Sequence, residues 1–267
     1  MARHQRARLT LAVALSSAML GLAAAPAQAG TAPTPVPSKA PTKAAPAKPT
    51  PVDCAKVKCI ALTFDDGPGK YAGTLLDTLK KHNAKATFML EGQYVKARPA
   101  FAKRMVTEGH QIGNHSYTHP HLRDLAPFEI REELERTEEA IVKATGQRSS
   151  VIRPPYGEFN ADVQQVAADM KMPLVLWNGG SRDWATKNTD AIYKEVLRNA
   201  KRDRVILMHD WVEQTVQVMP KLLTELEKQG YHMVTVSQLL RNGKKLQPGE
   251  IYPDPDVKPS ELESPAF

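Results

Sequence analysis

Apolar runs and amphipathic stretches alternate along the middle of the chain. The apolar runs are short and rich in residues that favour strands, and the stretches between them repeat apolar positions every three or four residues, as helices do. The predicted strands cover residues 58–64, 86–90, 110–114, 150–155, 174–178, 204–209 and 231–236. The predicted helices cover residues 72–82, 97–108, 127–145, 160–170, 189–200 and 215–229.

Strands that alternate with helices in this way predict a parallel sheet with helical crossovers. The runs are apolar throughout, as expected where helices cover both faces of a sheet. Polar residues gather at the carboxyl ends of the strands, and in a parallel barrel those ends meet at one mouth. We therefore predict an α/β fold, an irregular β/α barrel of about seven parallel strands with a site at that mouth. An open doubly wound sheet is the second interpretation.

The first 52 residues lack this alternation. A basic start, an apolar run and a small-residue cleavage pattern predict a secretory signal peptide over residues 1–29. The apolar run is too short and too rich in alanine to favour a membrane span. Residues 30–52 are rich in Pro, Ala, Thr and Lys and predict a semi-extended linker. We expect a secreted protein, extracellular or associated with the cell wall, that has no membrane attachment after cleavage.

The remaining chain predicts one domain over residues 53–245, followed by a proline-rich acidic tail over 246–267 that we expect to be loose or to lie along the surface. The only two cysteines, Cys54 and Cys59, lie five residues apart at the entrance to the first strand. In an exported protein this spacing predicts a small disulfide loop, and a metal-binding pair is the alternative.

The net charge of +7 is concentrated at the N-terminus. Residues 1–52 hold six Lys and Arg and no Asp or Glu, which leaves 30 basic against 29 acidic residues in the rest. This balance, with no basic stripe interleaved with aromatic residues, gives no support for a nucleic-acid partner.

We expect the protein to be a monomer.

The segment "TFDDGP" places Asp65 and Asp66 side by side at the end of a buried strand. Two adjacent carboxylates repel each other unless a cation lies between or beside them. The pair therefore predicts a cation whose other ligands come from elsewhere in the chain.

The segment "GNHSYTHP" offers such ligands. His115 and His119 are four residues apart, which on one turn of helix puts both imidazoles on the same side, and Pro120 then ends the turn. Alone, two such histidines could simply be solvated or hydrogen-bonded. With one carboxylate of the Asp pair they predict a two-His, one-Asp site with open positions, suited to zinc or another divalent first-row metal. His121 follows the proline and is predicted to lie at the surface.

In "VIRPPYGEF" two prolines stiffen the backbone after a strand and present Tyr156 on a fixed turn. The segment is either a rigid connection or a site at which the Tyr156 N–H faces an oxyanion while Arg153 pairs with a carboxylate.

In "LVLWNGGSRDWAT", Asp183 follows a Gly-Gly bend. Its carboxylate either packs in the structure or orients an arginine or histidine. Trp184 beside it offers an apolar face to a sugar ring. His209 is the last residue of a predicted apolar strand. It is interpreted either as a core residue or as a group that transfers a proton.

The ordered set "TFDDGP", "HSYTH", "RPPYG", "SRDW" and "LMHD" resembles the five motifs of the NodB-like polysaccharide deacetylases, carbohydrate esterase family four. The resemblance covers about residues 56–240, nearly the whole predicted domain. It implies an irregular β/α barrel, in agreement with the pattern of strands and helices. It also implies hydrolysis of N-acetyl groups on N-acetylglucosamine-containing glycans, with an acetylated polysaccharide or oligosaccharide as the partner.

The resemblance implies a role for each matching residue. Asp66, His115 and His119 would bind the metal, with Zn2+ expected first and Co2+ or Ni2+ as alternatives. Trp184 and Trp211 would offer surfaces for a sugar. The other implied roles are general base for Asp65, general acid for His209, orientation of a catalytic carboxylate for Arg153, a backbone N–H to the oxyanion for Tyr156, support of Arg153 or His209 for Asp183, and a wall of the acetyl pocket for Leu207.

One position departs from the family. Many members have an acidic residue three before the Asp-Trp pair, where this chain has Gly180, and this puts substrate preference in doubt. Two alternatives remain open: an acetylxylan esterase that cleaves O-acetyl groups, and a non-catalytic wall-binding module. A metalloprotease is disfavoured because the chain has no H-E-x-x-H helix.

Overall fold

The computed structural model describes residues 52–240 and 245–253. The predicted signal peptide, nearly all of the linker and the end of the tail lie outside these residues. None of the helices in the described ranges has the length and apolar character needed to cross a membrane.

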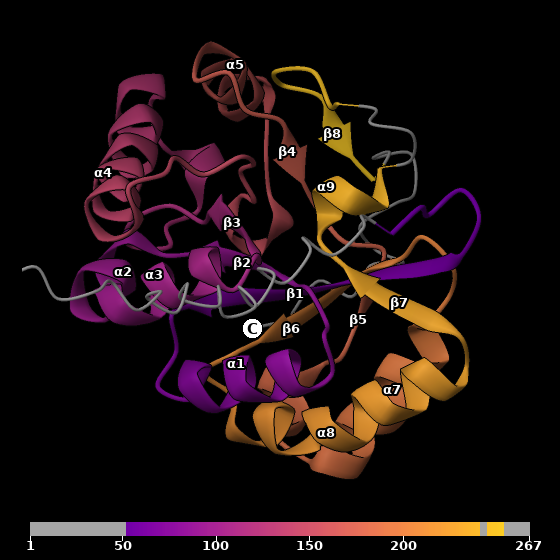
Figure 1. The fold of residues 1–267 in the computed structure, drawn as a ribbon. Coiled ribbons are helices and arrows are strands. Elements are labelled where there is room, and N and C mark those ends of the chain that lie inside the picture. Colours follow the sequence, from indigo (N-terminus) through magenta and orange to yellow (C-terminus); the bar gives the residue numbers. More distant parts are fainter. Residues whose placement is uncertain (1–51, 241–244, 254–267) are drawn as a thin grey trace, which may run out of the picture. The chain divides into compact units, whose positions relative to one another are not determined.

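Strand β1 (Lys58–Gly67) is the centre of the sheet (Figure 1). It pairs with β2 (Thr87–Leu90), and β2 pairs with β3 (Gln111–Asn114). It also pairs with β6 (Val205–His209) and, nearer its start, with β7 (Tyr231–Val234). All of these pairings are parallel, so the carboxyl ends of the strands face the same way.

Shorter strands extend the sheet at both ends. Beside β6 lies β5 (Gly179–Gly180), and β4 (Leu174–Val175) pairs with β8 (Ile251–Tyr252). The predicted strand over 150–155 is reduced to parallel bridges at Ile152, which connect β3 to β4. The prolines that follow Ile152 have no N–H to offer a sheet. The start of the tail, which we expected to be loose or to lie along the surface, supplies β8.

Helices cover this sheet, which forms the predicted irregular β/α barrel. In Figure 1, α1, α7 and α8 lie together on one side of β1 and β6, and α2, α3 and α4 form a second group. Six helices correspond to predicted ones, whereas α2, α6 and α9 are short and were not predicted. The bounds are α1 (Ala72–Lys81), α2 (Gly92–Ala97), α3 (Pro99–Thr107), α4 (Pro127–Thr145), α5 (Ala161–Asp169), α6 (Asp183–Thr186), α7 (Thr189–Asn199), α8 (Glu213–Lys228) and α9 (Val236–Leu239).

The two faces of β1 enter different parts of the core. Ile60, Leu62 and Phe64 belong to the apolar cluster that includes the buried side chains of α1 and α8. Cys59 and Ala61, which point to the opposite face, belong to a second cluster with residues of β4, β6 and β7. Because side chains alternate along a strand, Thr63 and Asp65 continue this second face. The inner face of β1 therefore turns polar towards its carboxyl end.

Cys54 and Cys59 form the predicted disulfide. Both residues are buried in the second apolar cluster. The bond therefore fixes the segment that enters β1.

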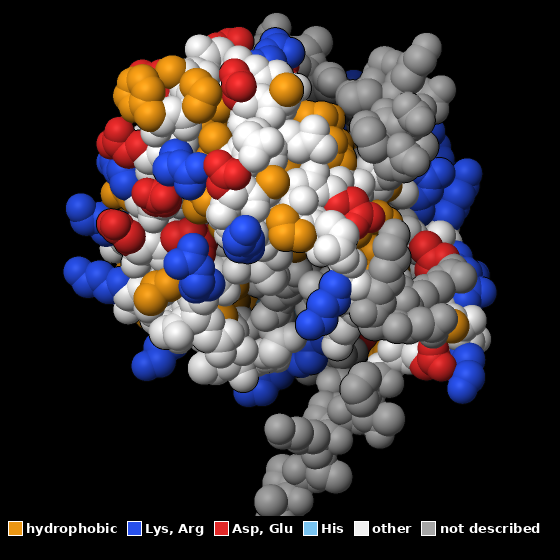
Figure 2. Space-filling view, turned by 90° about the horizontal axis from the view of Figure 1, so that it is seen from above, with side chains coloured by type: hydrophobic (Ala, Val, Ile, Leu, Met, Phe, Trp, Pro, Cys, Tyr) orange, Lys and Arg blue, Asp and Glu red, His pale blue; other side chains and the backbone are white. Residues whose placement is uncertain are grey.

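Charged side chains of both signs are mixed on the surface. In the face shown in Figure 2, Lys and Arg lie among Asp and Glu. Helix α4 illustrates the mixture, since Arg131 and Arg136 lie one turn from Glu135 and Glu132 respectively. Such pairs add a few tenths of a kcal/mol each to helix stability, about 0.2–0.5.

Candidate active site

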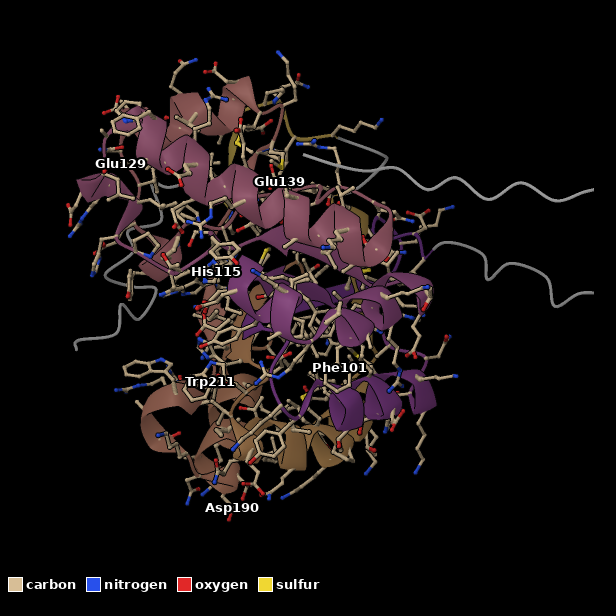
Figure 3. The ribbon with its side chains drawn as sticks, turned by 90° about the vertical axis from the view of Figure 1, so that its left-hand side faces the viewer. Phe101, His115, Glu129, Glu139, Asp190 and Trp211 are labelled. Carbon is tan, nitrogen blue, oxygen red and sulfur yellow. A yellow bond between two sulfur atoms is a disulfide. The ribbon has the colours of Figure 1, made fainter. Side chains whose placement is uncertain are left out.

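The carboxyl ends of β1, β3 and β6 meet around one cavity of about 280 Å3. Asp65 and Asp66 come from the end of β1, His115 follows β3, and His209 is the last residue of β6. His115 and Trp211 lie on the same side of the molecule, one above the other in Figure 3. The lining residues are Asp65, Asp66, His115, His119, Tyr156, Trp177, Trp184, Leu207, His209 and Trp211.

Neighbouring side chains of a regular strand point to opposite faces, but β1 is irregular at its end and both carboxylates line the same cavity. The pairing of β1 with β2 is regular at Phe64 but shifts before Gly67. Asp66, inside the shift, has a φ of 61°, a left-handed conformation that side-chain-bearing residues rarely adopt. Such backbone costs about 1–3 kcal/mol and is concentrated at functional sites. Here it brings Asp66 to the cavity that Asp65 also lines.

Asp66, His115 and His119 form a group that fits a metal ion. Their candidate ligand atoms all lie within 4.8 Å of one another. Asp66 Oδ1 is 3.3 Å from His115 Nε2 and 3.4 Å from His119 Nε2, yet this buried oxygen accepts no hydrogen bond. A buried carboxylate oxygen without a donor is costly, and a divalent cation would satisfy it. The two imidazoles and one carboxylate are typical zinc ligands.

The ionisation of Asp66 and His119 is compatible with that assignment. Burial would lower the pKa of His115, but the carboxylates of Asp65 and Asp66 outweigh it and raise the pKa, so a metal ion would displace a proton there. Burial alone would raise the pKa of Asp66, but the imidazoles of His115, His209 and His119 outweigh it and hold the pKa well below its usual range. Burial, assisted by the charge of His115, lowers the pKa of His119 to about 4. Asp66 is therefore an anion and His119 a neutral imidazole at neutral pH, the forms that bind metals.

The histidines lie on a loop, and the predicted helical turn between them is wrong. Ser116 and His119 have φ values of 63° and 61°, which no right-handed helix allows. The Ser116 N–H donates to Asn114 Oδ1, and the N–H groups of residues 117 and 118 donate to Glu133 Oε2. These side chains replace the helical hydrogen bonds and bring both imidazoles to the cavity from a compact loop.

Asp65 is held by a buried arginine. Arg153 Nη1 donates to Asp65 Oδ1 at 2.6 Å and to Thr63 Oγ1 at 2.8 Å. Its Nε and Nη2 donate to the carbonyl oxygens of Val175 and Leu176. The guanidinium is wholly buried, so its orientation is fixed on three sides. It therefore holds one oxygen of Asp65 in place and leaves Oδ2 facing His115 Nε2 at 3.6 Å.

From the sequence, Asp183 was expected to support either Arg153 or His209. In the structure it contacts His209. His209 Nδ1 lies 2.8 Å from Asp183 Oδ1, and the backbone N–H of His209 donates to Oδ2. Thr215 Oγ1 also donates to Oδ2, at 2.6 Å. Burial would lower the pKa of His209, but the charge and hydrogen bond of Asp183 outweigh it and raise the pKa to about 10. His209 is therefore a cation at neutral pH.

Tyr156 lies on a 3-10 turn, Pro155–Gly157, and has a φ of 61°. Its ring is 4.5 Å from that of His119 and stacks on that of His121 at 4.1 Å, with 17° between the planes. His121 Nδ1 in turn lies 2.7 Å from Glu158 Oε2. His121 is half exposed, as predicted, but it has a second role that the sequence did not reveal: it holds the Tyr156 ring in place.

Comparisons with known proteins identify the family to which this chain is related. Residues 53–175 match the family model described as polysaccharide deacetylase. A peptidoglycan-N-acetylglucosamine deacetylase of Bacillus cereus is 37% identical over 190 residues, which cover 69% of this chain and 89% of that protein. This chain belongs to the polysaccharide deacetylase family. 

Two further relatives of this deacetylase-family chain differ in extent. Peptidoglycan-N-acetylglucosamine deacetylase PgdA of Listeria monocytogenes is 40% identical over 198 residues, 74% of this chain but only 41% of PgdA. The chain thus spans less than half the length of that relative. A solved structure described as "T48 deacetylase with substrate" has a TM-score of 0.72 and 42% identity, covering 75% of this chain and 99% of that one.

Gly180, where this chain departs from many deacetylases, does not line the 280 Å3 cavity. The Gly-Gly bend expected from the sequence is strand β5, in which Gly180 pairs with Leu207 of β6. Asn199 Nδ2 donates to the Gly180 carbonyl oxygen. Gly179 has the tighter constraint, since a Cβ there would lie 2.7 Å from Ile206 Cδ1.

Several supporting residues of this site were not predicted. Both carboxylate oxygens of Asp210 accept the N–H of Gly69 at 2.9 Å, and burial raises the pKa of Asp210 to about 7. A Cβ on Gly69 would lie 2.6 Å from the Trp211 nitrogen, so this loop accepts only glycine there. The motif "LMHD" includes Asp210 and could have drawn attention to it. The motif "TFDDGP" likewise includes Thr63, whereas no sequence signal identifies Thr215.

Proposed function

We propose that this domain is a metal-dependent amide hydrolase that removes N-acetyl groups from N-acetylglucosamine-containing glycans, either peptidoglycan or chitin and its oligomers. One observation carries the proposal: a metal-binding triad, a carboxylate held by arginine and a cationic histidine line the same 280 Å3 cavity. The names of the Bacillus cereus and Listeria monocytogenes relatives favour peptidoglycan among these glycans.

A divalent ion held by Asp66, His115 and His119, with zinc as the first candidate, supplies Lewis-acid polarisation of the acetyl carbonyl and lowers the pKa of water. Asp65 is the general base: Arg153 fixes its orientation, and its second oxygen accepts the proton of the attacking water. The Tyr156 N–H donates to the developing oxyanion, and a donor of this kind contributes about 2.7–4 kcal/mol.

His209 is the general acid. Its Nδ1–H donates to Asp183, so the proton to be transferred is on Nε2, the nitrogen that lies 3.8 Å from Asp66 Oδ2. An amine leaves poorly unless it is protonated, whereas the alcohol of an acetyl ester needs less assistance. The cationic state of His209 therefore favours an N-deacetylase over an O-acetyl esterase.

The direct test is acetate release by the zinc-loaded protein from peptidoglycan, chitin oligomers and acetylated xylan. We expect release from at least one glucosamine polymer. Release from xylan alone would make the protein an esterase. No release from any of the three, by protein that binds zinc, would support the non-catalytic module and contradict the proposal.

Removal of the metal should abolish this activity. Chelation leaves Asp65 and His209 in place but removes the group that polarises the carbonyl, so we expect no measurable acetate release. Added zinc, cobalt or nickel should restore it, and the order of the restored rates would identify the best metal. Full activity in protein shown to be metal-free would remove the metal from the mechanism.

His121→Ala should lower kcat by about twofold to tenfold with a smaller change in KM. An aromatic contact contributes about 0.5–1.5 kcal/mol, and its loss frees the Tyr156 ring and with it the backbone N–H. The matched control is His82→Ala, which removes the other His–Glu pair far from the cavity, His82 with Glu227 at 3.0 Å. Equal kcat values for the two variants would exclude a positioning role for His121.

A further inference from the structure

Trp211 contacts the metal-binding triad directly. Its indole Nε1–H donates to Asp66 Oδ2 at 3.0 Å. The other oxygen of the same carboxylate, Oδ1, faces both imidazoles and accepts no hydrogen bond. The two oxygens of Asp66 therefore have different partners: Oδ1 faces the two imidazoles, and Oδ2 accepts the indole N–H, with His209 Nε2 3.8 Å away.

The position of Trp211 is itself fixed. The preceding residue, Asp210, binds the Gly69 N–H with both oxygens and is wholly buried. The Gly69 backbone approaches Trp211 so closely that no Cβ fits between them. The end of β6 is thus attached to the loop after β1 at two adjacent points, Gly69 with Asp210 and Asp66 with Trp211. A donor held in this way restricts rotation of the Asp66 carboxylate.

We propose that Trp211 is a positioning residue for the metal: its indole N–H occupies Asp66 Oδ2, so that Asp66 binds the metal through Oδ1 alone. This rests on the metal site of the proposed function. A free carboxylate can rotate or bind a cation with both oxygens, which would use a coordination position that the substrate needs. Hydrogen-bonding partners of metal ligands typically contribute about 10–100-fold to metal affinity or activity.

Trp211 also forms part of the wall between the 280 Å3 cavity and a neighbouring cavity of about 580 Å3, since it and Asp66 line both. Replacing the whole side chain would merge the two spaces and confuse two effects. Trp211→Phe keeps an aromatic wall and removes the N–H, so it isolates the hydrogen bond.

The experiment compares zinc dissociation constants, measured by competition with a chromophoric chelator, for the wild-type protein, Trp211→Phe and Trp184→Phe. Trp184 is the control because it lines the same cavity and comes from a different element, α6. We expect Trp211→Phe to bind zinc about 10–100-fold more weakly and Trp184→Phe to bind as the wild type does. With Co2+ in place of Zn2+, the visible absorption of Trp211→Phe should change in shape as Asp66 becomes free to bind through two oxygens.

A second measurement, of hydrogen exchange, uses the wild-type protein and so does not depend on the folding of a variant. In protein labelled with 15N-tryptophan, the Trp211 indole N–H should exchange with solvent much more slowly than that of free tryptophan. Exchange at the free rate, or an unchanged zinc dissociation constant in a folded Trp211→Phe, would overturn the proposal while leaving the proposed function intact. If the wild-type protein binds zinc and Trp211→Phe binds it more weakly as expected, but the wild-type protein releases no acetate, the positioning role of Trp211 is supported and the proposed function is contradicted.

Discussion

Asp65→Asn should lower kcat for acetate release by about 10²–10⁴-fold, the usual contribution of a general base. The substitution keeps the size of the side chain and the contact with Arg153 but removes the group that accepts the proton of water. Zinc binding should persist, because the ligands are Asp66, His115 and His119. The measurement is kcat on an N-acetylated oligosaccharide together with the zinc content of the purified variant.

The same substitution should lower the free energy of unfolding. Arg153 is wholly buried, and Asp65 is the carboxylate that pairs with it. Removing one partner of a buried ion pair costs about 3–5 kcal/mol. The control is Asp77→Asn, which breaks a surface pair with Arg104 and should leave both activity and stability unchanged. A variant of Asp65 that keeps wild-type kcat would contradict the assignment of the base.

His209→Ala should lower kcat on an acetamide substrate by about 10²–10⁴-fold and on an acetyl ester much less. The reason is the leaving group, since an amine requires protonation before it departs and an alkoxide requires it less. Rates for matched N-acetyl and O-acetyl sugars would be measured with the same variant. Equal losses on both substrates would contradict the role of His209 as a general acid.

The pH profile gives an independent check on the acid. His209 transfers a proton only while protonated, so activity should fall as the pH rises towards the pKa of His209, which is about 10. A bound divalent cation offsets part of the attraction from Asp66 and moves this fall to lower pH. Asp183→Asn removes the main charge that raises the pKa, so the fall should move to lower pH again. An alkaline limb unmoved by Asp183→Asn would contradict the pairing.

The sequence predicted the central strands well because they are buried on both faces. Apolar residues occupy most positions of 58–64 and 204–209, as expected for strands that helices cover on both faces. The polar residues at their ends could be assigned to one site for the same reason, since parallel strands end together. The candidate metal ligands Asp66, His115 and His119 do lie together at these strand ends. Arg153 was expected to orient a carboxylate there, and the structure identifies that carboxylate as Asp65.

What could not be predicted depends on backbone conformation and on distant contacts. The loop from His115 to His119 has the spacing of a helical turn, but its bonds to Asn114 and Glu133 override that spacing. Ile251–Tyr252 forms β8 because β4 has an open edge beside it, which nothing in the tail reveals. Trp211 was expected to face a sugar, and its bond to Asp66 spans 145 residues, beyond any local pattern.

The large separation in sequence between Asp66 and Trp211 affects when the site can form. Strand β1 is near the start of the domain, but its partners β6 and β7 lie towards the end of the described residues. Contacts so distant in sequence form late and slowly, because closing a long loop costs entropy before any pairing repays it. A growing chain that ends before β6 would carry Asp65 and Asp66 without His209 or Trp211, and its site would be incomplete. The topology of the sheet would therefore delay the proposed activity until β6 and β7 have joined β1.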